Sequence, residues 1–206
     1  LVAVLVVGGT LAYFTDTKSA TNTFTVGDVK IKLDESNVND PNGNRVTSNE
    51  YTGMLPGIQY KKDPVVTNTG KNGAYVRAVV TIENGMNWMG LYNENVWTAP
   101  QAEAFMKLIC NKMGEGWSLE DYNYVANAER GSTDFVAVLK YDGVLAAGKA
   151  TTAMFENIML PTNATASDIT TRVAQNGVFH IDVVAQAIQA DGFTTWENAF
   201  AAFDAK

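Results

Sequence analysis

The sequence predicts an all-β protein, a jelly-roll-like antiparallel β-sandwich with short helical insertions. Short segments in which apolar and polar residues alternate recur along the chain, which is typical of strands that are buried on one face. Clusters of Gly, Asn, Asp and Pro separate these segments and indicate turns. Strands and helices do not alternate regularly, which argues against a parallel α/β sheet.

The first part of the chain is expected to hold strands around one long loop. Apolar residues alternate with lysines in Phe24–Leu33 and with polar residues in Ala74–Ile82, and Tyr60–Thr67 is a further predicted strand. Asp34–Thr52 is dense in Asn, Asp, Ser and Gly and is predicted to be a loop. Leu55–Gly57 is predicted to be a turn because it combines Pro with Gly.

The segment from about residue 84 to residue 117 differs from its surroundings and is predicted to be an insertion. It begins with a stretch rich in Asn, Gly and Trp. Pro100–Met113 follows with apolar residues at helical spacing and is predicted to be a helix that Gly114 ends. Cys110 lies beside the apolar stripe and is expected to be a small buried hydrophobe. As the lone cysteine, it cannot form an internal disulfide.

Strands resume after the insertion, followed by a last helix. The predicted strands are Tyr122–Ala126, Asp134–Tyr141, Thr151–Met159 and Val178–Ala190. Ser167–Ala174 is predicted to be a short helix. The Thr194-Thr195-Trp196-Glu197 segment has the pattern of a capping box and predicts a helix that runs to Phe203.

The first twelve residues are predicted to be the remnant of a signal peptide, ahead of one domain over residues 13–206. Leu1–Val7 is an unbroken apolar run, far shorter than the roughly 20 residues of a membrane-spanning helix. Small residues at Thr10 and Ala12 suit a cleavage site, so we expect the cut between Ala12 and Tyr13. The alternative is a buried first strand.

Composition limits the classes of partner. The chain has 206 residues, 46% of them hydrophobic, which is enough for a packed core. Its formal net charge is −7 and it contains no run of basic residues. Nucleic acids and anionic lipids require clustered Lys and Arg, so neither is expected as a partner, and no stable membrane insertion is expected after processing.

The sequence offers little catalytic chemistry. His180 is the sole histidine, lies within a predicted strand and is expected to point outward without a catalytic role. The H-E-x-x-H, G-x-S-x-G and nucleotide-binding motifs are absent. Asp34–Asn44 has the oxygen ligands of a calcium loop, but an EF-hand frame places Val38 where an Asp is required. We therefore expect no catalytic residue, no cofactor and no metal site, with a solvated loop at Asp34–Asn44.

The tryptophans allow two interpretations. Trp88 and Trp97 lie in one segment rich in Gly and Asn, and Trp117 begins another group of aromatic residues. Aromatic side chains on loops can form a platform for a glycan or a protein partner. They can equally cap the end of a sandwich core, because large aromatic side chains usually bury their area.

Several motifs resemble those of the TasA/camelysin family of secreted proteins. The Gly-Gly-Thr-Leu-Ala segment at residues 8–12 runs into Tyr13, Phe14 and Asp16, and resembles the family's junction for a SipW-type signal peptidase. Further similar segments follow in order along the chain: Asn22–Leu33, Leu55–Gly57, Asp63–Gly70, Ala74–Arg77, Met154–Pro161 and Ala185–Phe193.

This resemblance implies a jelly-roll fold, export, and fibres of a biofilm matrix that form by strand exchange. Camelysin is classed as a metallopeptidase, but this sequence lacks a recognisable zinc ligand set, so that activity is not carried over. The expected partner is a second copy of the chain, with other matrix proteins or glycans as further candidates. The expected location is the extracellular matrix or the cell surface.

We expect the segment after the cut to be donated to a neighbouring subunit. Residues 13–26 are rich in Thr, which suits a strand, and Gly27 gives the chain freedom to leave its own domain. The residues assigned to this exchange are Tyr13, Phe14, Thr15, Phe24, Val26 and Gly27. The alternative is that the segment is the first strand of its own domain. Two other functions remain open, a monomeric adhesin or glycan-binding module that uses Trp88, Trp97 and Trp117, and a secreted hydrolase.

Overall fold

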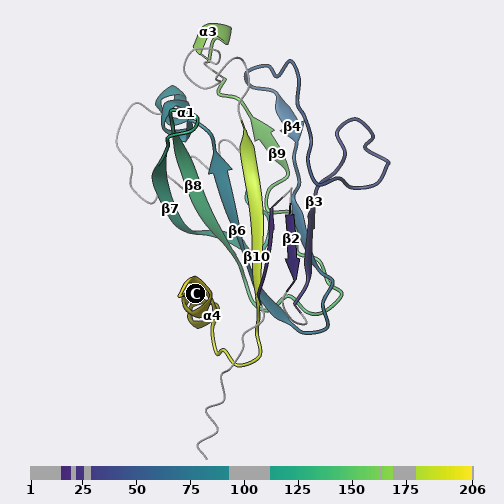
Figure 1. The fold of residues 1–206 in the computed structure, drawn as a ribbon. Helices are drawn as coiled ribbons and strands as arrows, with labels where there is room; N and C mark the ends of the chain where they lie inside the picture. The colour runs from purple at the N-terminus through teal and green to yellow at the C-terminus, as the bar shows by residue number, and fades with distance from the viewer. Residues whose placement is uncertain are drawn as a thin grey trace, which may run out of the picture.

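Antiparallel strands are the main regular secondary structure of the described chain (Figure 1). The computed structural model describes residues 15–19, 22–25, 29–92, 112–162, 164–168 and 180–205. The strands are β1 (Thr15–Ser19), β2 (Asn22–Thr25), β3 (Ile31–Asp34), β4 (Gln59–Lys61), β5 (Val65–Asn68), β6 (Ala74–Ile82), β7 (Trp117–Asn127), β8 (Ser132–Tyr141), β9 (Asn157–Met159) and β10 (Ile181–Gln189). The helices are α1 (Gly85–Tyr92), the one-turn α3 (Ala166–Asp168) and α4 (Trp196–Asp204).

The strands form one large and two small sheets. The large sheet has six strands in the order β2-β1-β10-β6-β8-β7, and β3 pairs with β5 and β4 with β9 in two separate pairs. All these strand pairs are antiparallel. Figure 1 shows β3, β4 and β9 gathered on one side of β10, away from β7 and β8. The expectation of a mostly β, antiparallel protein is therefore confirmed.

One apolar core joins the sheets. In β6 the buried and half-buried residues alternate along the strand, as the sequence predicts, and Val76, Val80 and Ile82 face the interior. Side chains from the small sheets belong to the same core, among them Ile31 of β3 and Ile158 of β9. Burial of such side chains contributes about 1.5–3 kcal/mol each, which makes this core the main source of stability.

Two segments predicted as single strands are in fact divided. Tyr60–Thr67 splits into β4 and β5, because the intervening Pro64 has no amide hydrogen for a ladder and Asp63 turns its carboxylate to Arg45. Phe24–Leu33 splits into the end of β2, which pairs with β1, and β3, which pairs with β5. The two parts of each segment thus belong to different sheets.

Two predictions from the second half need correction or fall partly outside the structure. Only Asn157–Met159 of the predicted strand Thr151–Met159 is a strand, because the preceding residues make isolated main-chain contacts, such as Met154 with Pro64, instead of a continuous ladder. The predicted helix Ser167–Ala174 is represented by α3, and its remainder lies outside the described residues. The predicted helix Pro100–Met113, including Cys110, also lies almost entirely outside them.

Helix α4 covers the outer face of the large sheet and confirms the last predicted helix. Its N-cap is Thr195, whose side chain accepts a hydrogen bond from the amide of Asn198. The indole Nε1 of Trp196 donates to the carbonyl of Val76 at 2.9 Å. The guanidinium of Arg77 lies 4.4 Å from the centre of the Phe200 ring. These contacts tie α4 to the strand at the centre of the sheet.

Candidate functional site

Two of the residues predicted for strand exchange lie near one edge of the large sheet. Thr15 is in β1 and Phe24 is in β2, whereas Ala12, Tyr13, Phe14, Val26 and Gly27 fall outside the described residues. Strand β1 pairs with β10 from Ala185 to Ile188, and β2 pairs with β1. In the single chain this segment therefore completes its own sheet.

The first half of β10 has an open edge. Opposite residues of an antiparallel pair alternate between hydrogen-bonded and non-hydrogen-bonded pairs. The amide of Glu83 donates to the carbonyl of His180, so the main-chain groups of Ile181 and Val183 point away from β6. Strand β1 pairs with β10 only from Ala185 onward. Among the described strands, none pairs with Ile181 or Val183 on that side.

A cavity of about 630 Å³ lies beside this open edge. Its lining comes from the start of β10, from β3, from the loop between β3 and β4, and from β9. Apolar residues of the lining include Leu33, Met54, Ile158, Ile181 and Val183. Polar and charged side chains make up the rest of the lining, among them Glu35, Asn49 and Lys62. A cavity of this size with mixed walls beside an unpaired strand edge suits an extended chain segment.

The loop between β3 and β4 forms the outer wall of the cavity, and Arg45 holds it in place. The Arg45 Nε atom lies 2.5 Å from Asp34 Oδ1, and its Nη2 atom donates to the carbonyl of Asp63 at 2.7 Å. Ser36 donates to Asp63 through both its amide and its hydroxyl, at 2.7 and 2.8 Å. Burial alone would raise the pKa of Asp63, but the bonds from Ser36 and the charge of Arg45 outweigh it and lower that pKa.

This arrangement shows how the candidate calcium loop is used. Asp34 and Asp63 direct their carboxylates to Arg45, and Lys32 lies 2.7 Å from Asp34. The side chain of Asn49 accepts from the amide of Val38 and donates to the carbonyl of Ser36, which closes the loop on itself. The carboxylate of Asp34, the first acidic residue of the candidate calcium loop, is thus paired with a guanidinium.

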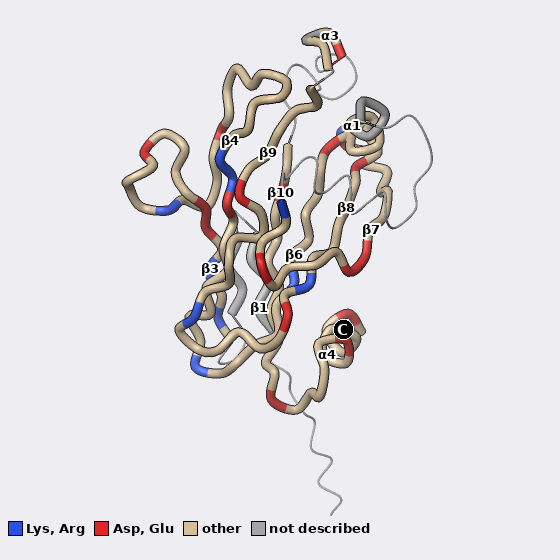
Figure 2. The backbone as a smooth tube through the Cα atoms, turned by 180° about the vertical axis from the view of Figure 1, so that it is seen from behind, with Lys and Arg blue, Asp and Glu red and all other residues tan. Residues whose placement is uncertain are grey.

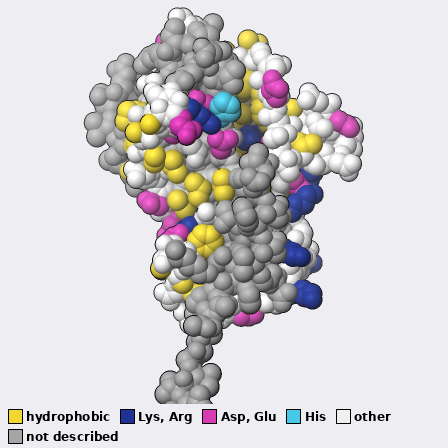
Figure 3. All heavy atoms as spheres, in the orientation of Figure 1, with side chains coloured by type: hydrophobic (Ala, Val, Ile, Leu, Met, Phe, Trp, Pro, Cys, Tyr) yellow, Lys and Arg dark blue, Asp and Glu magenta, His cyan; other side chains and the backbone are white. Residues whose placement is uncertain are grey.

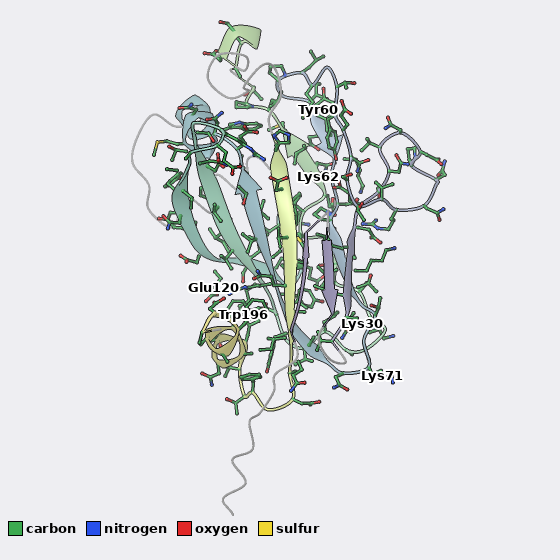
Figure 4. All side chains as sticks on the ribbon, in the orientation of Figure 1. Lys30, Tyr60, Lys62, Lys71, Glu120 and Trp196 are labelled. Carbon is green, nitrogen blue, oxygen red and sulfur yellow. The ribbon has the colours of Figure 1, made fainter. Side chains whose placement is uncertain are left out.

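The base of the cavity contains a buried ion pair. Lys62 Nζ lies 2.9 Å from Glu35 Oε2, and both side chains are almost completely buried. Nearby, the hydroxyl of Tyr51 donates to the carbonyl of Lys61 at 2.7 Å. Burial, with a smaller effect from Glu35, raises the pKa of Tyr51, so its hydroxyl stays neutral. Figure 4 shows Tyr60 and Lys62 on the β4 side of the molecule.

A cluster of charged residues fixes the start of β10 at the rim of the cavity. The Glu83 carboxylate is 3% exposed and accepts from the amide of His180 at 2.9 Å, with His180 Nδ1 at 2.6 Å from the same oxygen. Arg130 Nη1 lies 3.5 Å from Glu83, and its Nη2 lies 3.8 Å from Asp182. The His180 side chain is 51% exposed and points outward, as expected from the sequence (Figure 3).

The described donors do not assemble a metal site. A catalytic zinc ion takes three protein ligands and a structural one takes four. Within the described residues, no group of three or more His, Cys, Asp or Glu side chains is placed to hold a metal ion. His180 Nδ1 is engaged with Glu83, and Asp34 with Arg45. The side chains that sequence inspection would consider as ligands are thus committed to other partners.

Two of the tryptophans agree with the core interpretation and not with an exposed ligand platform. Trp88 is 1% exposed and Trp117 is 6% exposed, and both belong to the core. The Nε1 atom of Trp117 donates to the carbonyl of Thr152 at 3.1 Å. Trp88 is part of α1, at the start of the predicted insertion, and Trp97 lies outside the described residues. Burial of large aromatic area is therefore the role of Trp88 and Trp117.

Sequence reasoning missed the cavity and its rim. The sequence did not indicate that Glu83 is buried, because a carboxylate at the end of an apolar strand usually faces solvent. Its contact with His180 joins positions 97 residues apart and depends on the register between β6 and β10. Tyr51 and Met54 were part of a segment predicted only as loop and turn. The Asn and Asp residues of the predicted loop Asp34–Thr52 were the one feature of its sequence that indicated an ordered structure.

Comparison with known proteins gives one family match. The model of the family described as camelysin metallo-endopeptidase matches residues 1–70, about a third of the chain. The matched range includes β1 to β5 and therefore the edge segment and the outer wall of the cavity. No curated protein matches the chain, and no solved structure does. Over this N-terminal region, the chain is similar to the camelysin family.

Proposed function

We propose that this chain is a secreted structural protein that assembles into extracellular or biofilm-matrix fibres by donating its N-terminal strand to a neighbouring subunit. The observation that carries the proposal is the edge of β10. Strand β1 covers its second half, from Ala185 to Ile188, while no described strand covers Ile181 and Val183 beside the cavity. The unpaired main-chain groups of such an edge can form hydrogen bonds with a further strand.

The open edge offers main-chain groups to an incoming strand. A donated segment that pairs along Ile181–Ile188 makes a ladder twice as long as the one β1 makes over Ala185–Ile188. In the single chain, residues 15–25 form the hairpin of β1 and β2. We propose that this hairpin opens into one extended strand when it is donated. The additional main-chain hydrogen bonds favour the polymer over the closed single chain.

The cavity beside the edge provides specificity. Alternate side chains of an added strand point to the same face and enter pockets of the acceptor. Phe14 and Phe24 are the large apolar residues of the donor segment. Each ring would contribute on the order of 2 kcal/mol by burying its apolar area against residues such as Leu33 and Ile158. Gly27 then provides the flexible joint between the donor strand and its own domain.

The proposed architecture is a jelly-roll-like sandwich that the donated strand completes. The six-stranded sheet and the two small sheets share one core, which supports a two-layered arrangement. A donor strand at β10 would join the layer that already contains β6 and β8. Each subunit would present an acceptor edge and a donor segment at different places, and such a heterologous contact produces open filaments.

Export is the remaining part of the proposal. Camelysin-family proteins are secreted or surface proteins. Among the described residues, no helix has the length and apolar character needed to cross a membrane. We propose cleavage between Ala12 and Tyr13, which frees the donor segment only after export. N-terminal sequencing of the secreted form should begin at Tyr13, and a secreted chain that begins at Leu1 would contradict the proposed cut.

The family description also names a metal-dependent peptidase, and this chain gives no support for that activity. Its described residues provide no group of three potential ligands, and His180, its sole histidine, is engaged with Glu83. The donor set does not fit a catalytic zinc ion. We therefore propose a structural and non-enzymatic role, with a second copy of the chain as the partner.

The acceptor edge can be tested with one pair of substitutions. Val183→Pro removes the amide hydrogen that faces the open edge but leaves the ladder to β6, and Val183→Ala makes a similar loss of packing while keeping that hydrogen. A fluorescent peptide of residues 13–26 is added to a chain that begins at Gly27. The Val183→Ala protein should bind the peptide with slightly reduced affinity, and Val183→Pro should lose at least tenfold. Equal binding by both variants would contradict strand addition at this edge.

A further inference from the structure

A group of lysines occupies one corner of this otherwise acidic chain. Asn68 is completely buried and organises the corner: its side chain donates to the carbonyls of Asn72 and Leu145 and accepts from the amide of Gly70. The carbonyl of Lys30 accepts from the amides of Thr69 and Gly70, which brings β3 to the same turn.

The corner presents three exposed cations. The carbonyl of Lys149 accepts from the amide of Asn68 at 2.9 Å, and Lys71 follows directly after the turn at Gly70. Lys30, Lys71 and Lys149 are all exposed, and none of them has an acidic side chain within ion-pair distance in the described structure. In contrast, the neighbouring Lys32 is paired with Asp34. We call Lys30, Lys71 and Lys149 the lysine corner.

The opposite side of the molecule carries an unpaired strand edge with acidic side chains. Among the described strands, β7 pairs only with β8 and ends the six-stranded sheet. Its register shifts between Leu119 and Asp121, and Glu120 and Asp121 are exposed at this irregularity. The amide of Asp142 donates to the carbonyl of Gly116, which places Asp142 at the start of the same edge. Glu120, Asp121 and Asp142 form what we call the acidic edge.

The two surfaces cannot meet within one molecule. Figure 4 shows Lys30 and Lys71 on the β3 side and Glu120 on the other side, near α4, and Figure 2 shows basic residues along β3 and acidic residues at β7 and α4. Within the molecule, Lys140 is already paired with Glu197, which raises the pKa of Lys140 most, and Glu120 and Asp142 help to raise it. A further partner of opposite charge would therefore relieve the repulsion between the exposed carboxylates. A second copy of the chain carries both surfaces and therefore fits both.

We propose that the lysine corner of one copy binds the acidic edge of another, in a contact between copies that is separate from strand donation. It rests on the proposed function in that both require the chain to assemble. Oppositely charged surfaces steer and align association, and they weaken as salt screens them. The contact is heterologous, since two different surfaces meet, so it can extend without closing. The remaining explanation for the charges on β7 is protection of an open edge against unspecific pairing.

Charge reversal tests the contact. Lys30→Glu/Lys71→Glu makes both surfaces acidic, and Glu120→Lys/Asp121→Lys makes both basic. At low salt, light scattering should show each variant assembling at least tenfold more slowly than the unaltered chain. An equimolar mixture should recover, because an acidic corner then meets a basic edge. Glu156→Lys/Asp191→Lys changes two exposed residues elsewhere and alters the net charge as much as Glu120→Lys/Asp121→Lys does. It serves as the control for that variant, with little expected effect. A mixture as slow as its components would overturn the proposal.

A cross-linking measurement reads the contact independently of strand donation. Carbodiimide joins an amine to a carboxylate only where the two touch. A mixture of ¹⁴N- and ¹⁵N-labelled full chains at low salt should yield mixed-isotope links between Lys30 or Lys71 and Glu120 or Asp121. Such links without filaments would support this contact and count against strand donation. Filaments without such links, or with links at the same yield in high salt, would overturn the charged contact and leave strand donation standing.

Discussion

One carboxylate oxygen of Glu83 lies within 2.9 Å of the main-chain nitrogen of His180 and within 2.6 Å of its ring Nδ1. The side chain of Glu83 thereby replaces the ladder bond that the main-chain carbonyl of Glu83, the residue after β6, would otherwise accept at this point. It fixes the first residues of β10, whose outer edge is the proposed acceptor of a donated strand.

The Glu83 contact predicts a loss of local order when the carboxylate is removed. Glu83→Ala leaves the amide of His180 without its acceptor, and we expect the free energy of unfolding to fall by about 1.5–3 kcal/mol, the usual range for a hydrogen bond to a charged group. Glu83→Gln keeps an acceptor oxygen and should lose less. Urea denaturation measures both, and amide exchange should be faster at His180 in Glu83→Ala. Equal stabilities of the two variants would contradict this role.

The bond between Trp196 and Val76 predicts a specific contribution of α4. Trp196→Phe retains an aromatic ring but lacks the Nε1 donor, which leaves the buried carbonyl of Val76 unpaired. We expect the free energy of unfolding to fall by about 1–3 kcal/mol. Glu197→Gln, on the same turn, removes an exposed ion pair with Lys140 and should cost less. Thermal unfolding of the two variants compares their losses of stability, and a larger loss of stability for Glu197→Gln would contradict the prediction.

The Asp63 contacts predict a loss of stability in acid. The pKa of Asp63 is lowered in the folded chain, because the bonds from Ser36 and the charge of Arg45 outweigh burial. An ionised carboxylate of this kind stabilises the fold above the unfolded pKa of about 3.9, and the stabilisation is lost as pH falls through the lower folded pKa. Urea midpoints should therefore fall below about pH 4. Asp63→Asn should be less stable at pH 7 and show a shallower dependence in acid.

Other carboxylates add to the same acid dependence. A hydrogen bond from Lys140 is the main cause that lowers the pKa of Glu197 to about 2, and a bond from Arg77 lowers that of Asp204. Asp63→Asn should thus reduce the acid dependence without abolishing it. An unchanged slope in Asp63→Asn would contradict the assignment to Asp63.

Close packing of Gly85 predicts intolerance of a side chain at the start of α1. A methyl group at Gly85 would overlap Cβ of Phe135 and lie 2.7 Å from its amide nitrogen. Because main-chain atoms cannot move aside easily, Gly85→Ala should destabilise the fold by about 1–3 kcal/mol. Met86→Ala, at an exposed neighbouring position, should change stability little. Chemical denaturation compares the two, and similar stabilities would contradict the packing argument.

The sequence predicted the strands whose residues alternate without interruption. Ala74–Ile82 agrees with β6 at both ends, and Asp134–Tyr141 lies within β8, because one face of each strand packs on the core. The division of Tyr60–Thr67 was missed because the pairing partner changes at Pro64, which only the tertiary structure shows. The local pattern of apolar and polar residues indicates where a strand lies, whereas the sheet that the strand joins depends on tertiary contacts.

The candidate site was less accessible to sequence reasoning. The N-terminal motif led to the edge segment, and its family match covers that segment. The acceptor edge could not be found, because it depends on where β1 stops along β10, at Ala185. The cavity likewise depends on how Arg45 folds the β3–β4 loop against Asp34 and Asp63. Such features arise from register and from contacts between distant residues.

Electron microscopy of the chain that begins at Tyr13 tests strand donation most directly, beside the same chain without residues 13–26. Strand donation predicts filaments from the first protein and folded monomers from the second, because the deletion removes the donor segment and leaves the β10 edge as an acceptor. Circular dichroism verifies that the shortened chain is folded. Filaments that persist in the shortened chain, or a chain beginning at Tyr13 that stays monomeric at every salt concentration, would contradict assembly by donation of the N-terminal strand.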